Sequence, residues 1–263
     1  MREFIDQYLA HIIGLVALVQ VWIIAAWKKW IVRAKLEFHP TANIELGFSA
    51  FGSTISLPGA LRALNKDVFV TEMRVQITRL ADKAAHNFTW RAFKSSRLSG
   101  PTLTPENIEF ASSFTLGIGS PKVLNVFFAS ENFADRYAQK ANAIRSAWSA
   151  FLLAKQPIYG AQMPALLQDP AFVDNLFQEY SKSGETLNFY TALNNGFFWH
   201  AGDYLIELKV SGASIEDIIY RWQINLSEEE ESRLRLNAIS TMKEVCNIAV
   251  VYDFVYKPYQ VVA

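Results

Sequence analysis

Residues 8–27 form an uninterrupted apolar segment, and this feature constrains the fold more than any other in the sequence. The segment contains no Asp, Glu, Lys or Arg. As an α-helix it would rise about 30 Å at ~1.5 Å per residue, which matches the hydrocarbon core of a bilayer. The sequence therefore predicts one N-terminal transmembrane helix, within a membrane anchor that occupies residues 1–35 together with its basic flank.

Two other interpretations of this segment fit the following residues less well. A cleaved signal peptide would need a shorter apolar core and a small-residue cleavage site. The chain instead continues as Trp27-Lys28-Lys29-Trp30, which is bulky and basic. A buried core helix is usually shorter than this segment. The expected form is therefore a retained signal-anchor.

Charge sets the expected orientation of the anchor. Lys28, Lys29 and Arg33 follow the span, whereas the short tail before it carries two acidic residues and one basic one. Basic flanks stay on the cytoplasmic side, so we expect a single-pass membrane protein whose C-terminal domain is cytoplasmic. Aromatic residues at the two ends of the span are expected among the lipid headgroups: Tyr8, Trp27 and Trp30.

Small residues on one side of the span indicate where a second helix could pack against it. Gly14 lies between Ala10 and Ala17, and this spacing would let a second helix approach closely. The simpler interpretation is a helix with a few small residues and no dimer motif. The lipid bilayer is thus the expected partner, and a homo-oligomer through the transmembrane helix is an open alternative.

The charge of the remaining chain argues against nucleic acid as a partner. The sequence has 25 basic and 25 acidic residues, and residues 1–35 hold five of the former and two of the latter, which leaves a net charge near −3. Such a domain lacks the general basic surface that phosphate backbones require. Cys246 is the only cysteine, which excludes an internal disulfide and a cysteine-based zinc site. We expect no cofactor.

After a linker at 36–42, the apolar pattern changes to the period of a β-strand. Apolar and polar residues alternate in 44–49, 73–78 and 199–210, as in strands with one buried face. Short strands at 55–57 and 60–64 are expected on either side of Pro58-Gly59, because such residues favour turns. The domain 43–263 is therefore predicted to be a mainly-β, immunoglobulin-like sandwich.

A local motif at the start of one predicted strand supports this fold. The residues Ala201-Gly202-Asp203-Tyr204 resemble the tyrosine corner of immunoglobulin-like sandwiches, in which a tyrosine hydroxyl bonds to nearby backbone. Tyr204 is therefore expected to be buried, with its hydroxyl bonded to the backbone. The motif concerns architecture and says nothing about activity.

A helical insertion is expected at about 130–195. Ser130 can cap a helix, apolar residues then recur at helical spacing, and Gly196 is expected at the C′ position that ends the last helix. Strand patterns resume afterwards. One interrupted domain explains this order better than two consecutive domains, because the strands after the insertion are too few to stand alone. The overall class is α+β.

Candidate catalytic residues are few. His200 and Asp203 are close in sequence, but such a pair is more often structural than part of a triad. Ser227 to Glu230 forms a capping box, and the acidic run that ends at Glu231 suits the N-terminus of a helix. We therefore expect a membrane-anchored cytoplasmic interaction or binding module. The alternative is a membrane-tethered enzyme with active-site residues dispersed on loops around His200 and Asp203.

The connector between the predicted helices is the expected partner surface. Between Pro157 and Pro170 only Asp169 is charged. Such an apolar segment is either buried against the domain or exposed for a protein or small-molecule partner, and both alternatives stay open. Its candidate contact residues are Ile158, Met163 and Leu166.

Overall fold

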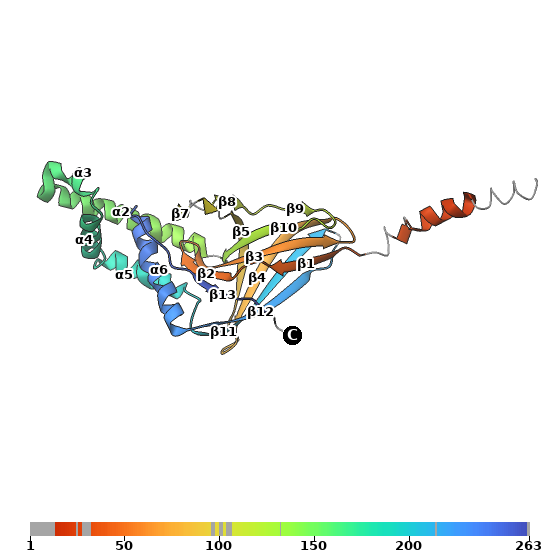
Figure 1. The fold of residues 1–263 in the computed structure, drawn as a ribbon. Coiled ribbons are helices and arrows are strands. Elements are labelled where there is room, and N and C mark those ends of the chain that lie inside the picture. The colour runs from red at the N-terminus through yellow and green to blue at the C-terminus, as the bar shows by residue number, and fades with distance from the viewer. Residues whose placement is uncertain are drawn as a thin grey trace, which may run out of the picture.

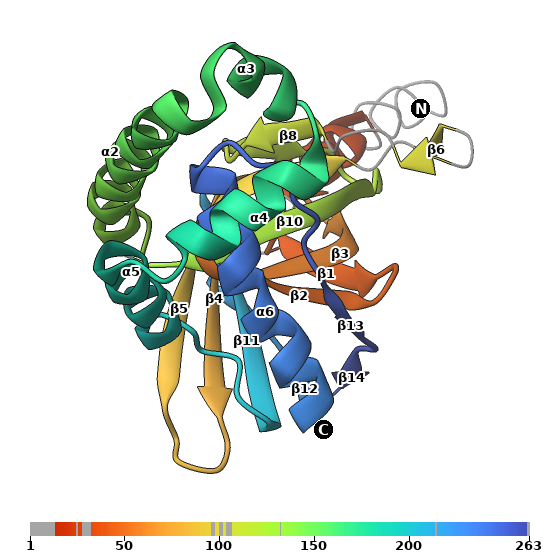
Figure 2. The ribbon, with the colours of Figure 1, turned by 90° about the vertical axis from the view of Figure 1, so that its left-hand side faces the viewer.

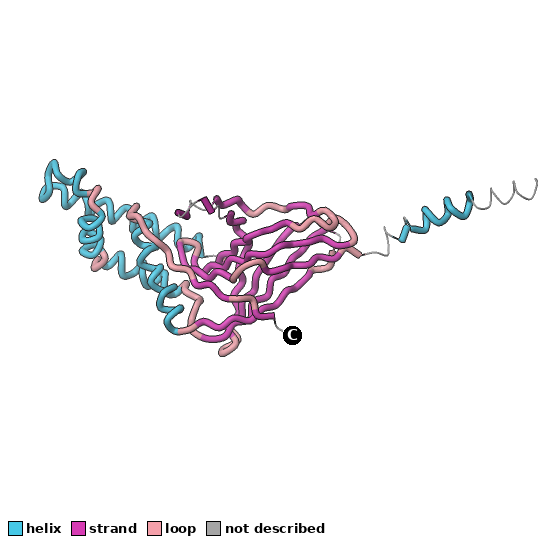
Figure 3. The backbone as a smooth tube through the Cα atoms, in the orientation of Figure 1, coloured by secondary structure: helices cyan, strands magenta, loops and turns pink. Residues whose placement is uncertain are grey.

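The computed structural model describes residues 14–24, 26–27, 33–95, 98–99, 102–103, 107–131, 133–213 and 215–261. Strands and helices occupy different parts of the molecule. The helices that follow residue 132 gather at one end of the sheet, on the left of Figure 1, and the tube in Figure 3 shows the same separation. Seen from that end, these helices lie in front of the strands (Figure 2).

Within the described ranges, twelve strands form one antiparallel sheet. Its main hydrogen-bonded path, from one end to the other, is β13 (Val255–Lys257), β2 (Ile44–Ser49), β3 (Gly52–Leu64), β10 (Lys122–Ser130), β5 (Ala85–Ser95), β4 (Val68–Arg79), β11 (Gly202–Ala213), β12 (Ile218–Leu226) and β14 (Gln260–Val261). Three strands pair beside this path: β1 (Lys35–Pro40) with β3, β8 (Asn107–Phe110) with β5, and β9 (Phe114–Leu116) with β4. The short strands β6 (Leu98–Ser99) and β7 (Thr102–Leu103) pair separately.

The two ends of the main path meet, so the sheet curves until it almost closes on itself. Only Pro258 and Tyr259 separate β13 from β14 along the chain. The Tyr259 hydroxyl donates to the carbonyl of Pro58 on β3 at 3.1 Å. The Tyr220 hydroxyl on β12 donates to the carbonyl of Leu36 on β1 at 2.8 Å. The first bond ties the connection between β13 and β14 to β3, and the second ties β12, near one end of the path, to β1, which pairs with β3 near the other end.

The immunoglobulin-like sandwich expected from the sequence is wrong, because the strands form one curved sheet and not two packed sheets. Both arrangements bury one face of each strand, so both give the same alternation of apolar and polar residues. Register shifts between Phe127 and Phe128 of β10, and between Ser211 and Gly212 of β11, mark β-bulges. Bulges increase local twist, and the sequence pattern did not reveal them.

The Pro58-Gly59 pair lies inside β3 and does not separate two strands as predicted. On one side of β3, β2 pairs with residues up to Ser56 and β1 pairs from Gly59 onward. Pro58 therefore sits in the gap between these partners, where its missing N–H leaves no ladder bond broken. Gly59 is needed beside it, because a Cβ atom would lie 2.2 Å from the Phe38 ring.

The helices form a layer over the end of the sheet. Helices α2 to α5 lie between β10 and β11 in the chain, and the last helix, α6, starts with the predicted capping box of Ser227 and Glu230. The buried side chains of the layer belong to the same hydrophobic cluster as the inner face of the sheet. The bounds are α2 (Phe133–Tyr159), the 3₁₀ turn η2 (Gly160–Gln162), α3 (Met163–Leu166), α4 (Pro170–Tyr180), α5 (Gly184–Asn195) and α6 (Glu228–Val245).

The Phe133 ring in the first turn of α2 joins the helical layer to the sheet. It lies against Gly52 at the start of β3 and against Gly196 after α5, where a Cβ atom would approach the ring to 2.6 and 2.2 Å respectively. Gly52 also has a φ of +79°, which glycine adopts without strain. Gly196 has a φ of −91°, so it leaves room for the ring and does not adopt the left-handed conformation of the predicted C′ glycine.

The predicted transmembrane anchor is wrong, because no helix among the described residues is long and apolar enough to cross a membrane. This finding overturns the signal-anchor, the single-pass membrane location and the cytoplasmic orientation derived from it. The predictions of a bilayer contact and of a homo-oligomer through the transmembrane helix were both derived from this helix, and they no longer have that basis.

The individual residues named for the anchor are placed as follows. Gly14 and Trp27 are exposed. Arg33 is exposed and pairs with Glu216 at 2.7 Å. The remaining residues named for the anchor and its flank lie outside the described ranges: Tyr8, Lys28, Lys29 and Trp30.

Gly196→Ala should destabilise the protein by about 1–3 kcal/mol, because the new methyl group overpacks the site that the Phe133 ring occupies. Urea unfolding followed by circular dichroism measures the change. Gly184→Ala is the matched control, because no atom lies within 4 Å of its added Cβ. Equal unfolding midpoints for the two variants would show that the packing of the Phe133 ring does not require a glycine at position 196.

Candidate functional site

A pocket of about 560 Å³ lies between the sheet and the helical layer. Four parts of the chain form its walls: the β4–β5 hairpin, the first turns of α2 with the preceding Ser130 and Glu131, the C-terminal half of α5, and the segment 196–200. Small-molecule sites in proteins have volumes of about 300–1,000 Å³. The size of this pocket therefore suits a small ligand.

Helix α2 presents a charged and aromatic stripe to the pocket. Phe133, Arg136, Tyr137 and Lys140 all line it, and spacings of three and four residues place side chains on one face of a helix. Because Phe133 is held between two glycines, its packing fixes how the first turns of α2 face the pocket. Arg136 and Lys140 are exposed, so both can reach a ligand.

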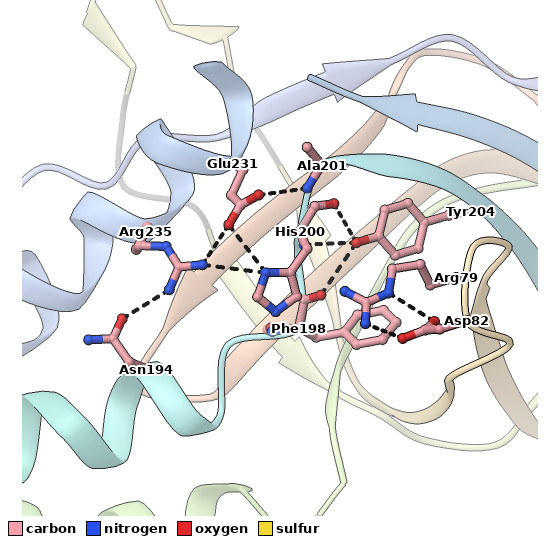
Figure 4. A network of polar contacts seen from close by, with 10 residues as sticks. Arg79, Asp82, Asn194, Phe198, His200, Ala201, Tyr204, Glu231 and Arg235 are labelled. Carbon is pink, nitrogen blue, oxygen red and sulfur yellow. Dashed lines mark hydrogen bonds and ion pairs between the residues drawn. The ribbon is translucent and has the colours of Figure 1, made fainter. Parts of the chain in front are cut away.

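Tyr204 fixes the segment 196–200, which forms the back wall of the pocket (Figure 4). Its side chain is fully buried, and its hydroxyl donates to the carbonyl of His200 at 2.6 Å and accepts from the His200 N–H at 2.8 Å. Burial raises the pKa of Tyr204 to about 12, so the hydroxyl keeps its proton at neutral pH. The burial and backbone bonds expected of this residue are therefore present, although the surrounding sheet is not a sandwich.

Glu231 connects the back wall to α6, as Figure 4 shows. Its carboxylate accepts from the backbone N–H of Ala201 at 2.7 Å and lies 3.2 Å from Nδ1 of His200. Arg235 donates to the same carboxylate at 2.5 Å and to Asn194 on α5 at 3.4 Å. Burial acts to raise the pKa of Glu231, but the hydrogen bonds from Arg235, Ala201 and His200 outweigh burial and lower the pKa below 4.5. The ionised carboxylate therefore joins the wall, α5 and α6.

Arg79 and His86 form the hairpin side of the pocket. Arg79 makes a two-point ion pair with Asp82 in the hairpin loop, in which Nε donates to Oδ1 at 3.0 Å and Nη2 donates to Oδ2. The pair uses two of the five N–H donors of the guanidinium. The His86 ring lies 4.3 Å from that of Phe198. Partial burial, and after it the charge of Arg79, lower the pKa of His86 below 6.5, so this imidazole is neutral at pH 7.

Several polar side chains of the lining are not used by the fold. Ser130, Lys140 and Asn195 make no side-chain hydrogen bond or ion pair with any other described residue, and the ring nitrogens of His86 make no hydrogen bond within the same ranges. A hydroxyl, an ammonium, an amide and a neutral imidazole can all donate. The pocket thus collects polar groups, mostly donors, that remain for a ligand.

In a second pocket, the positively charged side chains of the lining already have partners. It has a volume of about 230 Å³, is formed mainly by polar side chains of β4, β5 and β11, and shares Glu131 with the first pocket. Its two cations are already paired: Arg74 with Glu72 at 2.7 Å, and Lys209 with Asp217 at 2.6 Å. We therefore take the larger pocket as the candidate site.

The described residues contain no group of three or more His, Cys, Asp or Glu side chains that could hold a metal ion. Cys246 is buried, and burial raises the pKa of its thiol to about 12. A thiol with this pKa is not a nucleophile at neutral pH.

The structure places the residues of the predicted enzyme alternative apart. His200 lines the pocket with Glu231 as its carboxylate neighbour, whereas Asp203 accepts from Nδ2 of Asn225 on β12 at 2.8 Å. Between His200 and Asp203 no side-chain hydrogen bond forms. An enzyme with residues dispersed on these loops stays a prediction that no observation tests.

The three residues of the predicted partner surface do not share one face. Ile158 near the end of α2 is 68% exposed, whereas Met163 is only 6% exposed and belongs to the core. Leu166 is half-buried. Binding of a partner there remains untested.

Sequence reasoning missed the residues that define the pocket. Arg79, Arg136 and Lys140 come from two elements and form no motif, although the spacing of Arg136, Lys140 and Phe133 on one helix face was a usable signal. Glu231 was attributed to the helix N-terminus alone. Its contact with His200 joins positions 31 residues apart, and the sequence contains no sign of it.

We compared the chain with protein-family models, with curated proteins and with solved structures, and none of the three comparisons gave a match.

Tyr204→Phe should lower the free energy of unfolding by about 1 kcal/mol, because the His200 carbonyl loses the donor that holds the back wall. Chemical denaturation measures the loss. Tyr190→Phe serves as the control, because the Tyr190 hydroxyl makes no hydrogen bond with a described residue. If both variants unfold at the wild-type midpoint, the hydroxyl does not stabilise this wall.

Arg79→Gln should raise the pKa of His86, because the variant removes a nearby positive charge and leaves Asp82 without its partner. Nuclear magnetic resonance titration of the His86 ring protons measures the change. Arg62→Gln removes one cation at the far end of β3 and should leave the titration as it is. A His86 pKa that is the same in Arg79→Gln and wild type would mean that Arg79 does not act on the pocket.

Proposed function

We propose that this chain is a binding module for a small molecule and that the larger pocket is its binding site. One observation carries the proposal: polar side chains without a folding partner converge in a cavity of about 560 Å³. Ser130 is half-buried, and His86, Lys140 and Asn195 are exposed to solvent along the pocket. Small-molecule sites place a few convergent polar groups beside apolar walls, and a ligand in this cavity can bind to these groups.

The walls of the pocket support this proposal because several contacts hold them in place. Phe133 fixes the start of α2 against two glycines, and Tyr204 bonds both backbone groups of His200. Glu231 ties the same segment to α6. A site that is ordered before binding loses less conformational entropy on binding than a flexible one.

The proposal keeps the interaction module expected from the sequence and moves its binding site. The helical connector offers the exposed side chain of Ile158, but none of its residues is among those that line the larger pocket. The larger pocket combines apolar walls with polar groups, as small-molecule sites do. Binding therefore belongs at the junction of the sheet and the helices.

Ala192→Trp tests the site, because Ala192 lines the pocket from α5 and an indole there would occupy the cavity. A small-molecule fragment library is screened by ligand-observed magnetic resonance against the wild-type protein. We expect the hits to bind wild type and to be lost in Ala192→Trp, since the cavity is no longer available.

Ala150→Trp is the matched control, because Ala150 is an exposed residue of α2 outside the pocket. It should bind the same fragments as wild type, and circular dichroism should show that both tryptophan variants are folded. Fragments that bind Ala192→Trp as well as wild type would overturn the proposed function.

A further inference from the structure

We propose that the ligand of this pocket carries a negatively charged oxygen group, a carboxylate or a phosphate, on an apolar body. This inference rests on the proposed function of the pocket and specifies the chemistry of its ligand.

The charged side chains of the lining favour an anion. Arg79, Arg136 and Lys140 bring three positive charges to the pocket, and Glu131 brings the one carboxylate among the lining residues. A concave site with an excess of one sign concentrates ligands of the opposite sign. Lys140 makes no ion pair with a described residue, so its charge is not compensated by a neighbour.

The carboxylates near the pocket do not remove this excess. Asp82 holds Arg79 from the hairpin loop and uses two of the five guanidinium N–H donors, and the Tyr204 hydroxyl also interacts with this guanidinium. Glu131 lines both pockets, and its charge also acts in the neighbouring one, where it adds to the effect of hydrogen bonding to Glu72 in raising the pKa of Arg74. Lys140 on α2 therefore remains available to an anion, and Arg136 adds its positive charge to the same face of the helix.

Neutral donors complete the polar side of the pocket. The Ser130 hydroxyl and the Asn195 amide lie in the lining without a hydrogen-bond partner among the described residues, and the nitrogens of the neutral His86 ring likewise make no hydrogen bond there. A carboxylate or phosphate has several lone pairs and accepts from such donors in addition to cations. The combination of a guanidinium, an ammonium and neutral donors suits an oxyanion better than a halide or a neutral polar group.

The other side of the pocket is apolar. Phe189, Leu193, Phe197 and Phe198 line it and are between 1% and 6% exposed. Their rings and side chains form a packed floor that belongs to the core. The part of the ligand that contacts this floor should be apolar, because a polar group against the floor would lose its hydrogen bonds to water.

Three probes of similar shape test the inference: benzoate, phenyl phosphate and benzamide. Benzamide keeps the ring and the planar group of benzoate but lacks the charge. We expect wild type to bind benzoate or phenyl phosphate at least about tenfold more tightly than benzamide, the factor for one charge-assisted hydrogen bond. The preference should shrink as salt screens the charges. The stronger of the two anions identifies the oxyanion class.

Lys140→Gln should weaken anion binding about tenfold, because the variant removes a positive charge from the pocket. It should leave the binding of uncharged benzamide unchanged, and the fold should tolerate the change because Lys140 is exposed. Arg62→Gln is the matched control, because Arg62 is an exposed residue of β3 outside the pocket. It should leave the affinity of every probe at the wild-type value. Magnetic resonance signals of His86 report binding in the pocket itself.

The outcomes separate this inference from the proposed function. If benzamide binds as tightly as the anions and all three probes are lost in Ala192→Trp, the site stands and the anion inference is overturned. If the probes bind Ala192→Trp as well as wild type, the proposed function itself fails. If neither anion binds at millimolar concentration, the inference is likewise overturned, since the excess of positive charge does not then hold an oxyanion.

Discussion

The packing of one aromatic ring between two glycines determines how the two layers of this protein meet. Phe133 lies in the first turn of α2, while Gly52 and Gly196 come from the sheet and from the end of α5. A side chain on either glycine would displace the ring. The ring therefore sets how the start of α2, the start of β3 and the end of α5 pack against one another. The pocket lies at this junction because its α2 and α5 walls take their positions from this contact.

Polar contacts then fix the part of the wall that follows Gly196. Tyr204 bonds both backbone groups of His200, and Glu231 bonds the next N–H along the chain and the His200 ring. The two side chains come from β11 and α6, so the segment before β11 is held from both sides. Tyr204, Glu231 and Arg235 thus serve the fold, whereas Ser130, Lys140 and Asn195 of the other walls make no side-chain hydrogen bond or ion pair with a described residue.

The sequence predicted those features that depend on neighbouring residues. The capping box of Ser227 and Glu230 starts α6, and Tyr204 has its expected burial and backbone bonds. Features that depend on distant pairing were missed. Alternating residues show that a strand has one buried face and do not show which strand covers it, so a single curved sheet was mistaken for a sandwich. Pro58 was treated as a break because only the pairing of β1 and β2 shows the gap that accepts it.

The candidate site shows why composition is a poor guide to a ligand. The chain beyond residue 35 has a net charge near −3, and that balance bears on long polyanions, which need a broad basic surface. A small anion samples only the field inside one pocket. There, Arg79 meets Arg136 and Lys140 because a hairpin and a helix approach each other, and many of the acidic residues that balance them in the total lie elsewhere. The relevant charge is therefore a property of the fold, and no count along the sequence contains it.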